Sequence, residues 1–149
     1  MSNQKLIKFE IVTPERIVMK EEVVQITVPT RDGEITVLPN HIPLIATLRA
    51  GVVEIKNITN ETKIMSVSGG FLEVLKDKVV ILADRAERAE DIDEKRAEEA
   101  RIRAEELKKQ AIHKDDVDYV ALSSQIEKEI ARTHAVKRWR KIKGPENVS

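Results

Sequence analysis

The charged segment DIDEKRAEEARIRAEE, at residues 91–106, holds side chains whose types and spacing could bind an anion. Arg96 and Arg103 are seven residues apart, so two turns of an α-helix place both guanidinium groups on one face. Guanidinium groups form strong, paired hydrogen bonds with phosphate and carboxylate groups. The same segment also fits a solvated helix stabilised by pairs four residues apart, such as Glu99 with Arg103. Both interpretations stay open at this point.

Other motifs with a chemical meaning are few. The glycine pair in SGG, at residues 68–70, is not followed by the Lys-Ser/Thr of a phosphate-binding loop. It predicts a bend between strands, where glycine permits close backbone approach. His41, His113 and His134 are isolated in the sequence, so we predict no metal site. Because we find no nucleophile–base pair and no catalytic phosphate loop, we expect a non-catalytic protein.

The composition excludes several classes of protein. The 149 residues contain 26 basic and 26 acidic side chains, so the strongly positive field of many nucleic-acid-binding proteins is absent. The sequence has no cysteine, which removes disulfides and thiolate metal sites. No apolar run approaches the ~20 residues of a membrane-spanning helix, and the first residues lack the apolar core of a signal peptide. We expect a soluble cytoplasmic protein.

Residues 1–83 have the composition of a β-domain. They contain four of the five prolines and four of the five glycines, and neither type occurs between Phe71 and Lys143. Runs rich in Val and Ile predict strands at residues 6–12, 23–28, 34–38, 51–58, 63–68, 71–75 and 78–83. Asp32-Gly33, residues 57–63 and residues 76–78 have the chemistry of hairpin turns. Short strands without intervening helices predict an antiparallel β-sandwich or barrel.

Residues 84–149 have a helical period instead. Asp91-Ile-Asp-Glu94 has the form of a capping box with Asp91 at the N-cap. A stripe of small residues then follows at spacings of three and four: Ala97, Ala100, Ala104, Leu107 and Ala111. The motif HKDD, at residues 113–116, predicts a turn before a second helix over about residues 117–141. The apolar positions of that helix are Val120, Leu122, Ile126, Ile130 and Ala131. The short connection predicts an antiparallel hairpin.

The two halves together predict an α+β protein with a β-sandwich over residues 1–86 and a helical hairpin over residues 87–149. Alanine side chains bury little area, and burial stabilises by about 25 cal/mol per Å². We therefore expect the hairpin to be docked only weakly on the sandwich and able to move. A weak contact of this kind is a precondition for a conformational switch.

Five segments of the chain, taken in order, resemble the epsilon subunit of bacterial F-type ATP synthases. They are VTPERIVM (12–19), DGEITVLPNHIPLIATLRAG (32–51), VSGGFLEV (67–74), VVILADRAERAEDIDEKRA (79–97) and DVDYVAL (116–122). The resemblance implies a sandwich of about ten strands followed by a helical hairpin. It also implies a non-catalytic subunit of the rotating central stalk, whose sandwich binds the gamma subunit and rests on the ring of c subunits.

The resemblance further implies a mobile hairpin. In the family, the hairpin either folds on the sandwich or extends along gamma toward the alpha and beta subunits and blocks ATP hydrolysis. The expected location is the cytoplasmic face of the bacterial cell membrane, with contact to the membrane only through the c ring. Whether the motor moves protons or sodium ions is left open.

Some members of this family bind ATP in the folded hairpin through an Ile/Leu-Asp-x-x-Arg-Ala pattern, which this chain matches at residues 92–97. The resemblance implies a nucleotide site formed by Glu87, Ile92, Asp93, Arg96, Ala97, Arg103, Lys128 and Arg132. Lys128 stands where ATP-binding members have arginine, and an ammonium group cannot form the paired contact of a guanidinium. ATP would be a regulatory ligand here, and no cofactor is required.

Two further sets of contacts follow from the resemblance. Glu34 and His41 are expected to face polar loops of the c ring, although the prolines around His41 also fit a purely structural loop. Inhibitory contacts with the catalytic head are expected from five cations of the tail: Arg132, Lys137, Arg138, Arg140 and Lys141. These cations also suit a helix C-terminus, where positive charge complements the dipole. With one Trp, the tail offers no stacking platform for nucleic acid.

Two other classes of function compete with the stalk subunit. A free-standing adaptor that senses nucleotides could share this architecture, and recovery of gamma and the catalytic subunits with the chain would distinguish the two. An enzyme is the third class, and it would require steady ATP turnover that depends on Arg96 or Glu87.

Overall fold

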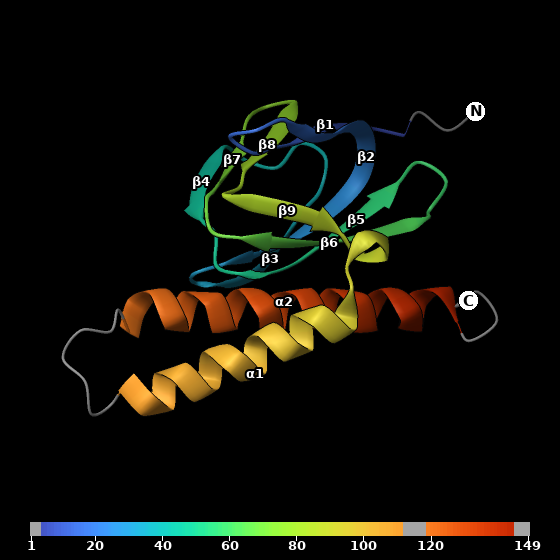
Figure 1. Ribbon diagram of the computed structural model, residues 1–149. Helices are drawn as coiled ribbons and strands as arrows, with labels where there is room; N and C mark the ends of the chain where they lie inside the picture. The colour runs from blue at the N-terminus through green and yellow to red at the C-terminus, as the bar shows by residue number, and fades with distance from the viewer. Residues whose placement is uncertain (1–3, 112–118, 145–149) are drawn as a thin grey trace.

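The computed structural model describes residues 4–111 and 119–144, which form a β-domain and two helices (Figure 1). The elements in chain order are β1 (Ile7–Val12), β2 (Ile17–Thr30), β3 (Gly33–Val37), β4 (Leu44–Thr47), β5 (Gly51–Asn57), β6 (Thr62–Ser68), β7 (Phe71–Val74), β8 (Lys78–Leu82), β9 (Arg85–Arg88), a 3-10 turn η1 (Ala89–Asp91), α1 (Glu94–Ala111) and α2 (Tyr119–Lys143). The predicted α+β class, with a sandwich before two helices, is confirmed. The turn expected at residues 113–116, including His113, lies outside the described residues.

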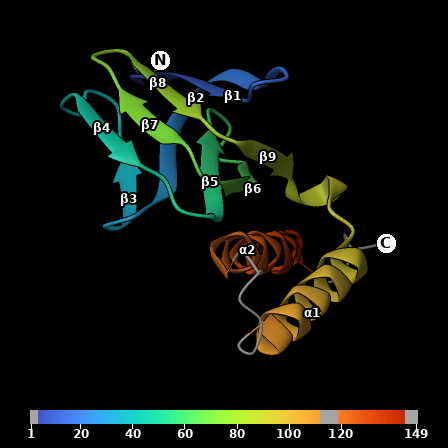
Figure 2. The same cartoon turned by 60° about the vertical axis from the view of Figure 1, so that its left-hand side comes forward.

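The strands are hydrogen-bonded in the order β4-β7-β8-β1-β2-β5-β6-β9, with β3 added beside β2. The 14-residue strand β2 pairs with β1 along its first half and with β3 and β5 along its second, so it joins the two layers of the sandwich (Figure 2). All pairs are antiparallel except β1 with β8, which run parallel. The described residues thus form nine strands, one fewer than the resemblance implies.

Turn chemistry located the strand ends correctly in several places. Gly33, with φ +121°, closes the turn between β2 and β3, where Thr30 Oγ1 donates to the Gly33 carbonyl. Asn57 Oδ1 accepts backbone hydrogen bonds from Thr59 (3.0 Å) and Glu61 (2.9 Å) between β5 and β6. The predicted SGG bend joins β6 to β7, and both of its glycines have positive φ. These turns fix the register of the strands that flank them.

Two strands and part of a third were not predicted. β2 begins at Ile17, six residues before the predicted run, because Lys20, Glu21 and Glu22 interrupt the apolar pattern on an exposed surface. β4 has only four residues, and β9, RAER, has none of the β-branched or aromatic residues typical of strands. β9 nevertheless pairs along β6, and it spans the expected domain boundary at residues 86 and 87.

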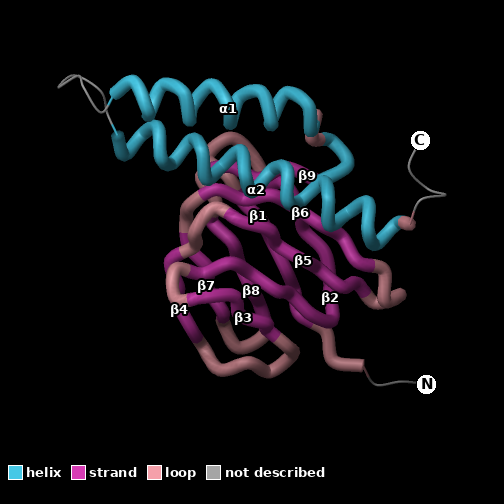
Figure 3. Tube along the Cα trace, turned by 90° about the horizontal axis from the view of Figure 1, so that it is seen from below, coloured by secondary structure: helices cyan, strands magenta, loops and turns pink. Residues whose placement is uncertain are grey.

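Helix α2 lies between the sandwich and α1, and the two helices run antiparallel across one face (Figure 3). α2 packs on β5 and β6, whereas α1 packs mainly on α2. The alanine stripe of α1 therefore faces the other helix rather than the sandwich, which corrects the expectation that it docks the hairpin. Ala97, Ala104 and Ala111 are the buried members of the stripe, and Leu107 is exposed.

The N-terminus of α1 also differs from its prediction. The helix begins at Glu94, and Asp93 Oδ1 accepts a hydrogen bond from the backbone N–H of Arg96 at 3.1 Å. Asp93 is therefore the N-cap residue, in place of Asp91, which belongs to the 3-10 turn. Both carboxylates fit the capping pattern, and the path of the chain after β9 selects the later one.

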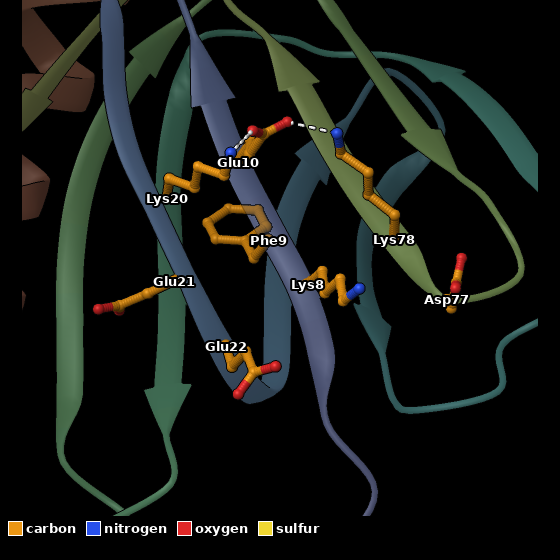
Figure 4. A pocket seen from close by; sticks show the side chains of 8 residues that line it. All are labelled: Lys8, Phe9, Glu10, Lys20, Glu21, Glu22, Asp77 and Lys78. Carbon is orange, nitrogen blue, oxygen red and sulfur yellow. Dashed lines mark ion pairs between the residues drawn. The ribbon is translucent and has the colours of Figure 1, made fainter.

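Inside the sandwich, inward-facing residues of every layer form one apolar core, which includes Phe9, Ile26, Ile55, Leu72 and Ile81. On the outer face of β1, Glu10 accepts from two lysines of the neighbouring strands (Figure 4). Lys78 Nζ lies 2.7 Å from Glu10 Oε2, and Lys20 Nζ lies 3.4 Å from Oε1. The hydrogen bond from Lys78 lowers the pKa of Glu10, against a smaller opposing effect of burial.

This lowered pKa predicts a pH-dependent contribution of Glu10 to stability. A carboxyl whose pKa falls on folding stabilises the protein above its unfolded pKa, and the contribution is lost as the pH falls through its folded pKa. Glu10→Gln should therefore lower the melting temperature near pH 7, and the difference from the unaltered chain should shrink as acid protonates Glu10 in the folded protein. Thermal unfolding across this range measures it, with the exposed Glu22→Gln as control. A gap between E10Q and the unaltered chain that persists in acid would contradict the assignment.

Candidate functional site at the interface of helix α2 and the sandwich

The contact between α2 and the sandwich has a small apolar centre. Ala135 and Val136 of α2 are buried there, and Trp139 packs beside them with part of its surface exposed. The opposing residues come from β5, β6 and the chain after β9: Val52, Ile64, Ala89 and Ile92. The only Trp in the sequence thus lies where α2 meets the sandwich, and its fluorescence should report whether the helix is docked.

Ion pairs surround this apolar centre. Arg138 Nη1 lies 3.6 Å from Glu54 Oε2 of β5, and Lys143 Nζ lies 3.8 Å from Glu61 Oε1 in the turn after β5. Arg140 forms an ion pair with Glu94 at the start of α1. The side chains of these pairs are a quarter to about half exposed, so each pair contributes only ~0–1 kcal/mol.

Arg132 makes the most buried ion pairs of the interface. Its Nη1 donates to Oε2 of the buried Glu129 at 2.9 Å, and its Nη2 donates to Glu87 Oε1 at 3.3 Å. Its Nε lies 2.8 Å from Glu87 Oε2, although the N–H is not directed at that oxygen. This network ties the middle of α2 to strand β9.

The structure brings three of the predicted nucleotide-binding residues together. Glu87, Lys128 and Arg132 line one cavity of about 440 Å³, between β9, the β1–β2 turn and α2. Lys128 has a lowered pKa, because burial and then the charge of Arg85 disfavour its ammonium form. A lysine with this unfavourable surrounding charge is well placed to accept an anionic group.

The other predicted nucleotide-binding residues lie apart from this cavity. Arg96 and Arg103 are exposed on α1, and neither lines the 440 Å³ cavity. Asp93 caps α1, Ala97 is fully buried on the α2 side, and Ile92 is 8% exposed within the apolar centre. In this arrangement Ile92 is packed against protein rather than open to a base. ATP binding by this set of residues stays a prediction.

Arg85 and Glu129 belong to this site and were not identified from the sequence. Arg85 lines the cavity with Lys128, and Glu129 holds Arg132. Recognising β9 as a strand would have found Arg85, because residues two apart in a strand share a face and Glu87 was already a candidate. No pattern in the sequence indicates that Glu129 is buried. Its neighbours Glu127 and Lys128 are also charged, so nothing sets it apart from them.

The expected c-ring residues lie at the β3 side of the sandwich. Glu34 is exposed in β3, and His41 lies in the loop after it, where its Nδ1 is 2.7 Å from the Ile42 carbonyl. In the tail, Lys137 and Lys141 are exposed, whereas Arg132, Arg138 and Arg140 have the ion pairs given above. Their partners in a larger assembly stay predictions.

Within residues 4–111 and 119–144, no three His, Asp or Glu side chains are grouped so that they could hold a metal ion. In the same part of the chain, no helix combines the length and hydropathy needed to cross a bilayer.

Comparison with known proteins gives consistent results for both halves of the chain. Residues 6–89 match the family model of the ATP synthase delta/epsilon chain β-sandwich domain, and residues 90–137 match that of its long α-helix domain. The ATP synthase epsilon chain of Pelotomaculum thermopropionicum is 49% identical over 104 residues, covering 70% of this chain and 77% of the relative. That of Herpetosiphon aurantiacus is 48% identical over 101 residues, covering 67% and 73%.

Solved structures show the same fold. A chain of the Euglena gracilis mitochondrial ATP synthase OSCP/F1/c-ring structure superposes with a TM-score of 0.78 at 22% identity, covering 91% of this chain and 84% of the other. A chain of the Tetrahymena thermophila central stalk and c-ring structure gives 0.54 at 14% identity, covering 93% and 98%. Both matches extend over sandwich and helices together. The sequence matches confirm the predicted family and its non-catalytic character: the chain belongs to the ATP synthase delta/epsilon chain family, among relatives named ATP synthase epsilon chain.

Proposed function

We propose that the chain is a subunit of the central stalk of a bacterial F-type ATP synthase, which couples gamma to the c ring and restrains ATP hydrolysis through its C-terminal helices. Family membership and the bacterial relatives named epsilon chain support the stalk role. The similar folds in the Euglena and Tetrahymena assemblies are consistent with it. In this proposal the protein is peripheral and reaches the membrane through the c ring.

The observation that supports the inhibitory part is that tail cations are held by carboxylates in the docked form. Arg132, Arg138 and Arg140 are three of the five cations expected to meet the catalytic head, and all three pair with carboxylates in the docked form. Acidic groups on a partner could replace those carboxylates one for one. Because the apolar centre is small and the outer pairs are weak, such an exchange has a low net cost.

Removal of the helices tests this proposal. A chain that ends at Asp91 keeps β9 and the 3-10 turn, and it should assemble with gamma as the full chain does. The reconstituted complex should then hydrolyse ATP several-fold faster, because the inhibitory segment is absent. ATPase activity and co-purification of gamma are measured together. Normal assembly with unchanged hydrolysis would remove the inhibitory claim.

The same reconstituted complex tests the c-ring contact. Glu34→Gln combined with His41→Ala should weaken retention of the catalytic head on c-ring membranes while leaving gamma bound. If the catalytic head is fully retained, these two residues do not contact the c ring, and the loop around His41 has only a structural role.

The adaptor alternative is distinguished by recovery from native membranes. Gamma and the catalytic subunits should co-purify with the chain if it is a stalk subunit, and neither should appear if it acts alone. ATP remains a proposed regulatory ligand, which the cavity of Glu87, Lys128 and Arg132 supports, and the titrations described below include it.

A further inference from the structure

A second and larger cleft separates α2 from the end of the sandwich. It has a volume of about 750 Å³ and adjoins the cavity already described, sharing Asp84, Arg85 and Lys128 with it. Its charged side chains are Arg31, Arg49, Asp84, Arg85, Glu127 and Lys128. None of the sandwich residues Arg31, Arg49 and Arg85 belongs to the nucleotide site implied by the sequence.

The cations of this cleft come from four separate segments. Arg31 lies in the turn between β2 and β3, Arg49 between β4 and β5, Arg85 in β9 and Lys128 in α2. Chain segments so distant in sequence are brought together only by the fold and the docked helix. Backbone hydrogen bonds from the Arg31 N–H to Thr47 (2.9 Å) and from the Arg49 N–H to Pro29 (3.1 Å) fix the first two positions.

These cations are not neutralised within the described part of the chain. None of the four has a carboxylate oxygen of a described residue within 4 Å, unlike Arg132 nearby. Asp84 and Glu127 also line the cleft, so four positive charges face two negative ones. Asp84 lies close against Gly69, where a Cβ would be 2.2 Å from its Oδ2. The cleft therefore has an excess of positive charge.

Lys128 is affected both by its burial and by that excess of positive charge. Its pKa is lowered, first by burial and next by the positive charge of Arg85, with a further contribution from Arg132. The neighbouring Glu129 and Glu87 act in the opposite direction without cancelling the shift. An anion placed in the cleft would relieve this repulsion and favour the charged ammonium group.

We propose that this cleft binds a small phosphate-type polyanion, with Arg31, Arg49 and Arg85 of the sandwich and Lys128 of α2 as its ligands. Guanidinium forks match phosphate oxygens in pairs, and the ammonium group supplies a point charge. A diphosphate or triphosphate group fits the volume and carries enough charge to balance the excess. Since its ligands come from both sides of the interface, the bound anion holds the hairpin in the docked position. The inference rests on the docked arrangement, and the cleft shares only Lys128 with the proposed site for ATP.

Thermal unfolding of the full chain with inorganic pyrophosphate and tripolyphosphate tests the proposal, followed by Trp139 fluorescence and by circular dichroism. Ionic strength is held constant with sodium chloride, and sodium sulfate serves as an anion control. A ligand that binds only the docked state raises the transition temperature in proportion to the logarithm of its concentration. We expect this rise with both polyphosphates and a much smaller one with sulfate. Equal shifts with sulfate, or none at all, would overturn the proposal.

Two double variants of equal charge change identify the residues. Arg31→Gln with Arg49→Gln should abolish the pyrophosphate effect, and both side chains are exposed, so the fold should persist without anion. Arg96→Gln with Arg103→Gln removes the same charge from α1 and should retain it. Retention in the first variant, or equal loss in both, would refute the cleft as the site.

Parallel titrations with ATP separate this inference from the proposed nucleotide site. Loss of the ATP effect only in the Arg96 and Arg103 variant supports the nucleotide site in α1. An ATP effect that is lost in the Arg31 and Arg49 variant and retained in the Arg96 and Arg103 variant assigns ATP to the cleft and rejects the site in α1.

Discussion

Replacing Ala135 with glutamate is expected to release the helices from the sandwich while the sandwich stays folded. Ala135 is fully buried between α2 and the residues Val52, Ile64, Ala89 and Ile92. An ionised carboxylate has no partner in this apolar centre, and burying it there would cost several kcal/mol. The weak outer ion pairs cannot offset such a cost, so the undocked state should predominate.

Trp139 provides the measurement for this variant. Its emission should shift to longer wavelength in Ala135→Glu, and amide exchange should accelerate in α2 but not in β5 or β6. His134→Glu is the matched control, because it adds the same charge to the adjacent, exposed position and should leave the helix docked. Emission and exchange equal to those of the control would show that the interface tolerates the charge.

The same variant connects docking to the proposed inhibition. If the released helices inhibit the motor, a complex that contains Ala135→Glu should hydrolyse ATP more slowly than one with the unaltered chain. The chain that ends at Asp91 should have the opposite effect. An increase in hydrolysis with Ala135→Glu would indicate that the docked form, and not the extended one, is inhibitory.

Gly70→Ala adds only one methyl group, but we expect it to cause a large loss of stability in the sandwich. Gly70 has φ +103°, a conformation that residues with a side chain rarely adopt. A Cβ there would lie 1.9 Å from the Leu82 carbonyl oxygen and 2.8 Å from the Ala83 Cα. Both are backbone atoms, so β7 and β8 would have to separate. We expect the free energy of unfolding to fall by about 3 kcal/mol or more.

Gly33→Ala is the control for backbone strain alone. Gly33 has φ +121°, but no atom lies within 4 Å of a Cβ built there. It should lose about 1–2 kcal/mol, from strain without a steric clash. Chemical denaturation of both variants measures the difference. Equal losses would mean that the contact with the Leu82 carbonyl is relieved by a small shift of the chain.

Local patterns in the sequence determined most of the fold. The strands β5 and β6 were predicted because runs of Val and Ile and the turn residues near Asn57 act within a few positions of each other. The two helices were predicted for the same reason, since their period and the lack of Gly and Pro are local properties. Helix periodicity also put Lys128 and Arg132 on one face, and both line the same cavity.

Tertiary structure decided the features that depend on distant partners. The segment Arg85–Arg88 has no strand propensity, and it becomes β9 because β6 offers unpaired backbone groups beside it. Its path into the 3-10 turn then makes Asp93, and not Asp91, the cap of α1. Neither choice is visible in the residues themselves, because each follows from a hydrogen-bonding partner elsewhere in the chain.

For the residues of the site, too, the sequence determined one part and the tertiary structure the other. Spacing showed that Arg96 and Arg103 share a helix face, but not which neighbour that face meets. Burial of Ala97, Ala104 and Ala111 against α2 fixes the rotation of α1 and leaves the two arginines exposed. Arg31, Arg49 and Arg85 meet Lys128 only in the folded chain. Periodicity within an element is encoded locally, whereas the faces that meet are set by the packing of all the elements together.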